Sequence, residues 1–440
     1  MVRQIVPVFA LLLGSALLLF AGGMHGLILP VRGSIEGFSA SALGLLGTGW
    51  AVGYVAGCLI APRLVGMVGH IRTFGVMCAM AAAAVLLQAL IVETWAWIPV
   101  RAVSGFCFAG AAMIVESWLN DRAQPGTRGT IFGIYTMVNL VAVTAGQMAI
   151  SLGDASGFVF FAVAAIVYCL ALVPTALSTS ASPAPLTSVR LDLPALWRNS
   201  PVAVVAVFLV GISNAAFGTL AAVYADRVGL ALTAIALFVS IPVLAGALAQ
   251  IPIGLASDRM DRRKVLLATA VVALAADLAF VLLLPEGRLL NLLLVGAFGA
   301  AIFAMYPIIV AHANDHAPPG TSIQVSGGLL MVFGLGSILG PLVAGVAMTE
   351  LGPGGLFLTT VVAHVLMIVF TIWRMAVKAA VPEDQKTPFQ ISVPARAATP
   401  ETAALSAGED EAEPLEASEE DAPGDDPAPE EGAGPESADR

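Results

Sequence analysis

The sequence has few charged residues. Asp, Glu, Lys and Arg make up 11% of its 440 residues, whereas a soluble globular domain carries about 25%. So few charges cannot cover the surface of a chain this long in water. Because 58% of the residues are hydrophobic, lipid must surround most of the protein. This balance argues against a soluble enzyme and against binding to nucleic acid.

Cysteine is scarce as well. No CxxC or HExxH pattern and no Cys/His cluster occurs, so we expect no metal site. No GxxxxGK[ST] loop occurs either, so we do not expect ATP as the direct energy source, and we expect no cofactor. Four cysteines are present, each inside an apolar stretch where a thiol packs as a small hydrophobic group: Cys58, Cys78, Cys107 and Cys169.

Long apolar runs dominate what remains. A helix that crosses about 30 Å of hydrocarbon needs about 20 mostly apolar residues, and backbone groups in lipid must bond within the helix. Twelve runs meet this requirement, which predicts an all-α membrane protein with twelve transmembrane helices. They cover residues 5–29, 41–61, 72–92, 96–119, 129–152, 157–177, 201–223, 231–256, 265–284, 290–312, 324–348 and 355–377.

The basic residues near the ends of these runs gather on one side. If the N-terminus is inside, thirteen lie at inner ends and three at outer ends. Cytoplasmic loops carry the excess of Lys and Arg, so we expect a multi-pass protein of a bacterial inner membrane with both termini cytoplasmic. The inner residues are Arg3, Arg63, Arg72, Arg122, Arg128, Arg190, Arg198, Arg259, Arg262, Arg263, Lys264, Arg374 and Lys378; the outer ones are Arg32, Arg227 and Arg288.

Two segments differ from the apolar body. Residues 178–200 are rich in Ser, Thr and Pro, which is typical of a linker, and they separate residues 1–177 from residues 201–378, with six predicted helices each. Residues 379–440 hold seventeen acidic and three basic residues. Such a segment repels itself and lacks apolar periodicity, so we expect a disordered, solvated, acidic cytoplasmic tail. A regulatory or docking tail is the alternative.

The two halves repeat each other. Residues 120–127 (NDRAQPGT) and 314–321 (NDHAPPGT) are identical at six of eight positions, at an offset of 194 residues, and Gly105 matches Gly299 at the same offset. Both segments follow the fourth run of their half. Repeats of six helices indicate two pseudo-symmetric six-helix bundles, which in transporters place the substrate between the halves.

A second repeated element gives the chain its family resemblance. The loop after the eighth run, GLASDRMDRRK at 254–264, together with the twelve runs and the 6+6 repeat, resembles the major facilitator superfamily. Arg101 and Gly105 resemble its R-x-x-x-G signature, and residues 116–120 (ESWLN) are similar to an uncharacterised bacterial YcaD-like branch. The loop after the second run departs from the pattern, with Ala61 where the acid would be.

The resemblance implies a cavity lined by the first, fourth, seventh and tenth helices. These helices carry His25, Arg101, Asn214 and Tyr306. Because Arg101 and His25 lie at similar depth, we expect Arg101, helped by His25, to attract an anionic group of the substrate or to couple to a proton. The alternative is a scaffold role, in which Arg101 bonds backbone carbonyls.

Other ionisable residues are candidates for gating. Glu116 lies close enough to the inner loops to meet Arg63, Arg72 or Arg128, either as a gate that forms in one state or as a static contact. In the second half we expect Asp258, Arg259 and Arg262 to do the equivalent work.

Two polar residues lie deep in the ninth and twelfth helices. Asp277 and His364 are at similar depth, which predicts a hydrogen bond that ties these helices together. A proton relay is the functional alternative.

The sequence favours a secondary active transporter that moves a small solute by alternating access, and the resemblance implies proton coupling. A non-transporting sensor or assembly factor is the alternative, and a lipid-modifying enzyme is a weaker one. The few charges fit a drug-like or amphipathic substrate, while Arg101 and His25 fit an organic anion. We expect a monomer in contact with membrane lipid.

Overall fold

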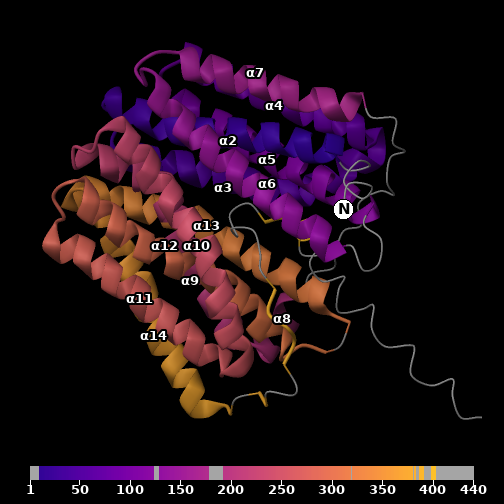
Figure 1. The fold of residues 1–440 in the computed structure, drawn as a ribbon, viewed down its shortest axis with the longest axis vertical. Coiled ribbons are helices and arrows are strands. Elements are labelled where there is room, and N and C mark those ends of the chain that lie inside the picture. The colour runs from indigo at the N-terminus through magenta and orange to yellow at the C-terminus, as the bar shows by residue number, and fades with distance from the viewer. Residues whose placement is uncertain are drawn as a thin grey trace, which may run out of the picture.

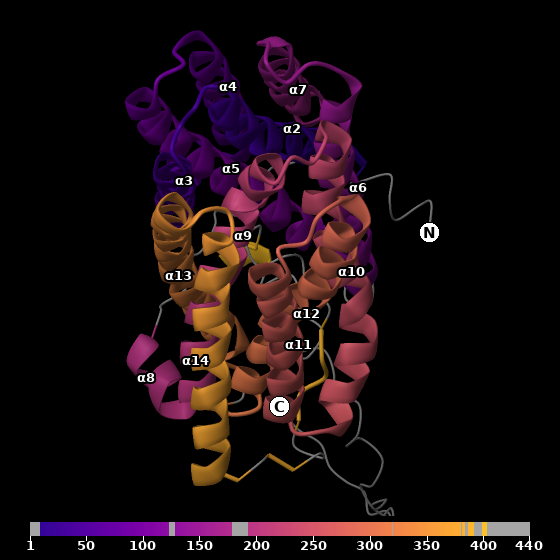
Figure 2. The ribbon, with the colours of Figure 1, turned by 90° about the vertical axis from the view of Figure 1, so that its left-hand side faces the viewer.

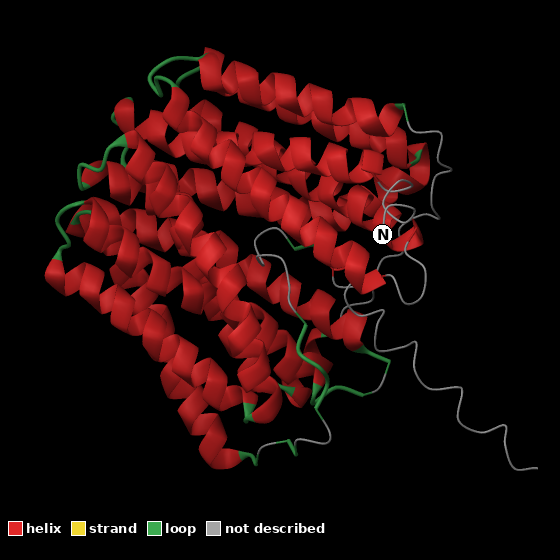
Figure 3. Cartoon of the chain, in the orientation of Figure 1, coloured by secondary structure: helices red, strands yellow, loops and turns green. Residues whose placement is uncertain are grey.

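The computed structural model describes residues 9–122, 128–177, 192–318, 320–379, 381–382, 386–390 and 398–402. Within these ranges every regular element is a helix (Figure 3). Twelve of the helices are long and apolar enough to cross a membrane. The predicted all-α fold with twelve membrane-spanning helices is therefore confirmed.

The helices fall into two sets along the chain. The first comprises α2 (Phe9–Ile35), α3 (Ala40–Val68), α4 (His70–Leu90), α5 (Thr94–Arg122), α6 (Arg128–Ala149), the short 3₁₀ helix η2 (Ile150–Leu152) and α7 (Val159–Ala176). The second comprises α8 (Leu193–Asn199), α9 (Pro201–Arg227), α10 (Leu232–Arg259), α11 (Arg262–Leu283), α12 (Arg288–Asn314), α13 (Ser322–Leu351) and α14 (Gly355–Val377).

Helix α8 lies inside the segment that we expected to be an irregular linker. Asp192 caps it, since its side chain accepts a hydrogen bond from the backbone N–H of Ala195 at 2.9 Å. This is the usual way to satisfy a free N–H at a helix start. Residues 178–191 of the expected linker lie outside the described ranges.

The two sets form two bundles, which meet along α3 with α13 and along α6 with α10 (Figures 1 and 2). The same close helix contact occurs once in each bundle. A Cβ on Gly105 in α5 would lie 2.1 Å from the carbonyl oxygen of Trp50 in α3, and one on Gly299 in α12 would lie 2.2 Å from Cα of Pro242 in α10. No side chain fits at either contact. The duplication seen in the sequence is thus a duplication of helix packing.

The bundles are joined at one end of the molecule. We call the end that carries Ala176 and Pro201 the linker end. At the opposite end, the Ser34 hydroxyl donates to Asp226 Oδ2 at 2.5 Å across the halves. Close by, a Cβ on Gly44 would lie 2.3 Å from the carbonyl oxygen of Pro341. The two halves are therefore in close contact at the opposite end.

Part of the C-terminal tail differs from the expected solvated chain. Ala398, Thr399 and Thr402 are buried, with 5%, 0% and 4% of their surface exposed. The expectation rested on the acidic run after residue 408, whereas residues 386–402 contain a single acid, Glu401. The acidic run itself lies outside the described ranges.

Candidate functional site

A cavity of about 220 Å³ lies between the two bundles. Helices α2, α3, α5, α6 and α7 line it from the first half, and α9, α10 and α12 line it from the second. Its polar lining residues are Ser15, His25, Arg101, Ser104, Glu116, Tyr135, Thr136, Asn139, Gln147 and Asn214, and its aromatic ones are Trp50, Phe108, Tyr168, Phe217 and Phe303.

Arg101 and His25 form one polar centre in this cavity. Nη1 of Arg101 lies 3.4 Å from Nδ1 of His25, whose Nε2 lies 2.7 Å from Oε1 of Gln88. A guanidinium only donates hydrogen bonds, so Nδ1 accepts and Nε2–H donates to Gln88. His25 is neutral in this arrangement, and it orients the guanidinium toward the cavity.

Two polar side chains in the cavity have fewer partners than buried polar groups usually have. Arg101 forms no ion pair and no bond to a backbone carbonyl among the described residues. This argues against the scaffold alternative. Asn214 is 2% exposed, and neither its amide nitrogen nor its amide oxygen has a partner. Both residues line the cavity with hydrogen-bonding groups that the described residues leave partly unused.

Tyr306 departs from the expectation. It lies outside the cavity lining, and its ring packs edge-on against Phe333, with centroids 5.7 Å apart. Its ring therefore lies against α13, within electrostatic range of Tyr54 in α3. The expectation failed because it assigned a helix to the cavity without choosing the face of that helix.

Helix α6 contributes residues that the sequence analysis missed. Tyr135 donates a hydrogen bond to Glu116 Oε1 at 2.9 Å, and Ser15 donates to Asn139 Oδ1 at 2.9 Å. Tyr135, Asn139 and Gln147 are separated by multiples of four residues, so they share one face of the helix. This polar stripe in an apolar run was the signal available in the sequence.

Glu116 does not form the expected ion pairs. Its described partners are Tyr135 and, in the tail, Thr399 and Thr402. The side chains of Arg63 and Arg72 are exposed. The side chain of Arg128 lies outside the described residues. The predicted gate contact of Glu116 is therefore absent from the described contacts in this conformation.

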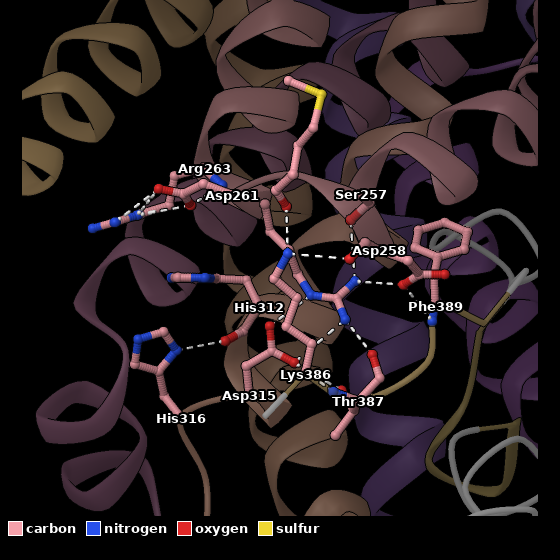
Figure 4. A network of polar contacts seen from close by, with 12 residues as sticks. Ser257, Asp258, Asp261, Arg263, His312, Asp315, His316, Lys386, Thr387 and Phe389 are labelled. Atoms are coloured by element: carbon pink, nitrogen blue, oxygen red, sulfur yellow. Dashed lines mark hydrogen bonds and ion pairs between the residues drawn. The ribbon is translucent and has the colours of Figure 1, made fainter. Parts of the chain in front are cut away.

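The second-half loop forms a polar network, in which Figure 4 labels Asp258 and Asp315; Arg262 pairs with both. Arg262 Nε lies 2.6 Å from Asp315 Oδ2, and Nη1 lies 3.4 Å from Asp258 Oδ1. Arg259 is exposed and takes no part among the described contacts. Asp315, which the sequence did not mark as part of a gate, lies in the repeated NDHAPPGT turn. Only the fold shows that this turn faces the loop after α10.

The start of α11 adds a second ion pair to this loop. Arg263 Nη2 lies 2.8 Å from Asp261 Oδ2, and the backbone N–H of Arg263 donates to Asp261 Oδ1 at 3.0 Å. Burial alone would raise the pKa of Asp261, but the hydrogen bonds and charge of Arg263 outweigh it and lower the pKa. Asp261 is therefore ionised and fixes the helix start.

Asp277 and His364 lie in contact in the second half. His364 Nδ1 is 2.6 Å from Asp277 Oδ2, Thr360 donates to Asp277 Oδ1 at 2.6 Å, and Ser213 Oγ is 3.2 Å from His364 Nε2. This cluster joins α9, α11 and α14. Neither Asp277 nor His364 lines the cavity, and both side chains are fully buried.

The described residues contain no group of three or more His, Cys, Asp or Glu side chains that could hold a metal ion. The cavity lining offers hydrogen-bonding, charged and apolar groups.

Known proteins of similar sequence are transporters by name. An uncharacterised MFS-type transporter of Yersinia enterocolitica is 24% identical over 396 residues, covering 87% of this chain and 98% of that protein. The uncharacterised MFS-type transporter YcaD of Escherichia coli is 25% identical over 361 residues, covering 80% of this chain and 91% of YcaD. The resemblance drawn from the motifs is confirmed.

Solved structures agree on the fold. The nucleoside transporter NupG has a TM-score of 0.69 at 16% identity and covers 84% of this chain and 98% of its own. A bacterial homologue of the human lysosomal transporter Spinster, in an inward-facing and occupied conformation, has a TM-score of 0.68 at 15% identity. The match covers 88% of this chain and 98% of the homologue. The Major Facilitator Superfamily model matches residues 11–246 and 203–408. This multi-pass membrane protein therefore belongs to the major facilitator superfamily.

Proposed function

We propose that this protein is a secondary active transporter that moves a small solute across the cytoplasmic membrane by alternating access, coupled to protons. The observation that carries the proposal is the cavity between the halves, where the Arg101 guanidinium has His25 as its single partner among the described residues and the Asn214 amide has none. Unpaired buried groups are costly, and a bound solute would supply the missing partners.

The cavity chemistry favours a small organic anion as the substrate. The Arg101 guanidinium can donate two parallel hydrogen bonds to a carboxylate or phosphate. Asn214 offers one donor group and one acceptor, and Trp50, Phe108 and Phe217 supply apolar walls. A drug-like or amphipathic solute without an anionic group would leave Arg101 unsatisfied.

His25 is the group best placed to couple transport to protons. A proton added at Nδ1 would remove the acceptor of Arg101 and place two cations side by side, which repel each other. An anion bound at this centre would relieve that repulsion, so proton and anion would bind cooperatively. In contrast, Asp277 and His364 are enclosed away from the cavity, which favours their role as a structural tie.

The conformation supports alternating access. The halves touch closely at the end opposite the linker, as expected of one of two states that rock about a central site. The arginine-rich loops lie at the linker end, for which we propose the cytoplasm. The state described would then be inward-facing, like that of the Spinster homologue.

The test takes two steps. Purified protein is first screened by thermal shift against organic anions, because a ligand that binds the folded state raises the unfolding temperature. We expect hits for the wild type and for Arg288→Gln, an exposed arginine, and not for Arg101→Gln. A hit must then drive counterflow in proteoliposomes. Binding without counterflow would favour the alternative, a non-transporting sensor or assembly factor.

A further inference from the structure

Two short pieces of the C-terminal tail lie between the bundles at the linker end. They are residues 386–390 and residues 398–402, which we call the tail pieces. They follow the last membrane-spanning helix, α14, and they belong to neither six-helix bundle. Each piece nevertheless bonds to one of the bundles.

The first tail piece binds the second half through its loop network (Figure 4). The backbone N–H and the hydroxyl of Thr387 donate to Asp315 Oδ1 at 2.9 and 3.0 Å, and the Thr387 carbonyl accepts from Arg262 Nη2. The backbone N–H of Phe389 donates to Asp258 Oδ1 at 3.0 Å. Asp258, Arg262 and Asp315 are therefore the docking groups of the second half.

The ring of Phe389 fixes the same piece by packing. A Cβ on Gly254 in α10 would lie 2.4 Å from Phe389 Cδ1, so the ring occupies the space that the absent side chain leaves. Lys386 Nζ donates to the carbonyl of Met260 at 2.7 Å. Backbone, side-chain and apolar contacts together specify one docked position.

The second tail piece binds the first half. The Tyr54 hydroxyl in α3 donates to the carbonyl of Ala398 at 2.9 Å, and the Thr399 hydroxyl donates to Glu116 Oε2 in α5. Thr399 also accepts from the backbone N–H groups of Glu401 and Thr402 at 3.2 and 3.3 Å. Because Glu116 lines the central cavity, this piece reaches the cavity wall itself.

We propose that the tail pieces form a built-in plug, which docks between the halves at the linker end and must leave before that end can close. The partner of this interaction surface is the chain's own tail. The plug has bonds to both halves, and its buried residues occupy the space that closure would fill. A ligand that binds only one of two states shifts the population toward that state, and the docked tail acts in the same way. It favours the open state and obstructs the cavity from the linker side.

The plug can be tested in the full-length chain without knowing the substrate. A spin label is attached at Pro388, whose side chain is exposed, in a variant with the four cysteines replaced. Thr387→Val and Thr399→Val, combined, remove two hydroxyl donors to carboxylates while keeping the side-chain shape. Each hydrogen bond raises the equilibrium constant for docking by about tenfold or less. Loss of both should therefore lower that constant about 10- to 30-fold. Thr387→Ser with Thr399→Ser keeps the hydroxyls and is the matched control.

The expected result is an immobile label in the wild type and the serine variant and a mobile label in the valine variant. A second label pair, at Arg72 and Lys264, should report a larger closed population at the linker end in the valine variant alone. A label that is equally mobile in all three proteins would overturn the plug. Release of the tail without a change in the Arg72–Lys264 distance would also overturn the plug. In that case the tail would dock without restraining the halves.

Discussion

Thr399 of the tail donates a hydrogen bond to Glu116, a residue of the cavity wall 283 positions earlier in the chain. Tyr135 donates to the other carboxylate oxygen of Glu116 at 2.9 Å. Both oxygens are thus occupied while the tail is docked. A gate between Glu116 and an arginine of the inner loops would use the same carboxylate, so the docked tail takes up acceptor sites that the expected gate would use.

Replacement of Arg101 tests the proposed anion site. Arg101→Gln should weaken binding of an anionic ligand about 10- to 100-fold, since hydrogen bonds from a charged donor contribute about 1.5–3 kcal/mol. Arg101→Lys should lose part of the affinity, because an ammonium group keeps the charge but cannot donate two parallel hydrogen bonds as a guanidinium does. Isothermal titration calorimetry measures both. Unchanged affinity in Arg101→Gln, with Arg288→Gln as the control, would remove Arg101 from the site.

Replacement of Asp277 separates a structural tie from a proton relay. Asp277→Ala leaves His364 and Thr360 without their partner, so it should cost about 1–2 kcal/mol and lower the unfolding temperature. Asp277→Asn can keep hydrogen bonds but cannot carry a proton. A structural tie predicts that Asp277→Asn transports with normal proton coupling. Loss of coupling in a variant of normal thermal stability would favour the relay.

Docking of the tail should depend on pH through Glu401. Burial raises the pKa of its carboxyl to about 7 in the docked tail, above its ordinary value, so the docked tail holds a proton that the free tail loses. Docking is therefore tightest at acid pH. It weakens as the pH rises above the ordinary pKa of a glutamate carboxyl, and it stops weakening once the pH exceeds about 7.

The mobility of the label at Pro388, followed from about pH 5 to about pH 8, measures this dependence. In Glu401→Gln the mobility of the label should depend less on pH. Glu116 in α5 interacts electrostatically with Glu401, so the comparison reports the contribution of Glu401 together with its coupling to Glu116. An identical pH profile in the two proteins would show that the carboxyl of Glu401 plays no part.

Filling the space under Phe389 tests docking from the side of the helix bundle. Gly254→Leu should displace the ring and release the tail, because the added side chain claims volume that the ring already occupies. Gly66→Leu is the matched control, since a Cβ on Gly66 meets nothing within 4 Å. If the label at Pro388 stays immobile in Gly254→Leu, the ring does not hold the tail.

The fold was predictable to a large extent because lipid imposes a simple rule. Every spanning backbone must form a helix of sufficient length, so all twelve helices followed from apolar runs. Their ends did not: α2 runs on to Ile35, past Arg32, which pairs with Glu36 one turn later at 2.5 Å. A charge at a helix end that reaches water does not end the helix.

The site was predictable only in part. Arg101 and His25 could be placed together because depth along a helix follows from residue counting. The face of a helix does not follow in the same way, which is why Tyr306 was misplaced and Asn139 was missed. Contacts made by the tail were beyond prediction, since Thr399 and Thr387 carry no pattern and their partners lie far away in the sequence.

The most direct test of the account measures both ends of the molecule in one experiment. Spin-label pairs at Arg72 and Lys264, and at Glu36 and Arg227, report the separation of the halves at the linker end and at the opposite end. Alternating access predicts reciprocal changes when a proton gradient or a transported anion is applied: when one distance shortens, the other lengthens. If both distances stay fixed while the ligand binds, or if both change in the same direction, the protein does not work as a carrier of this kind.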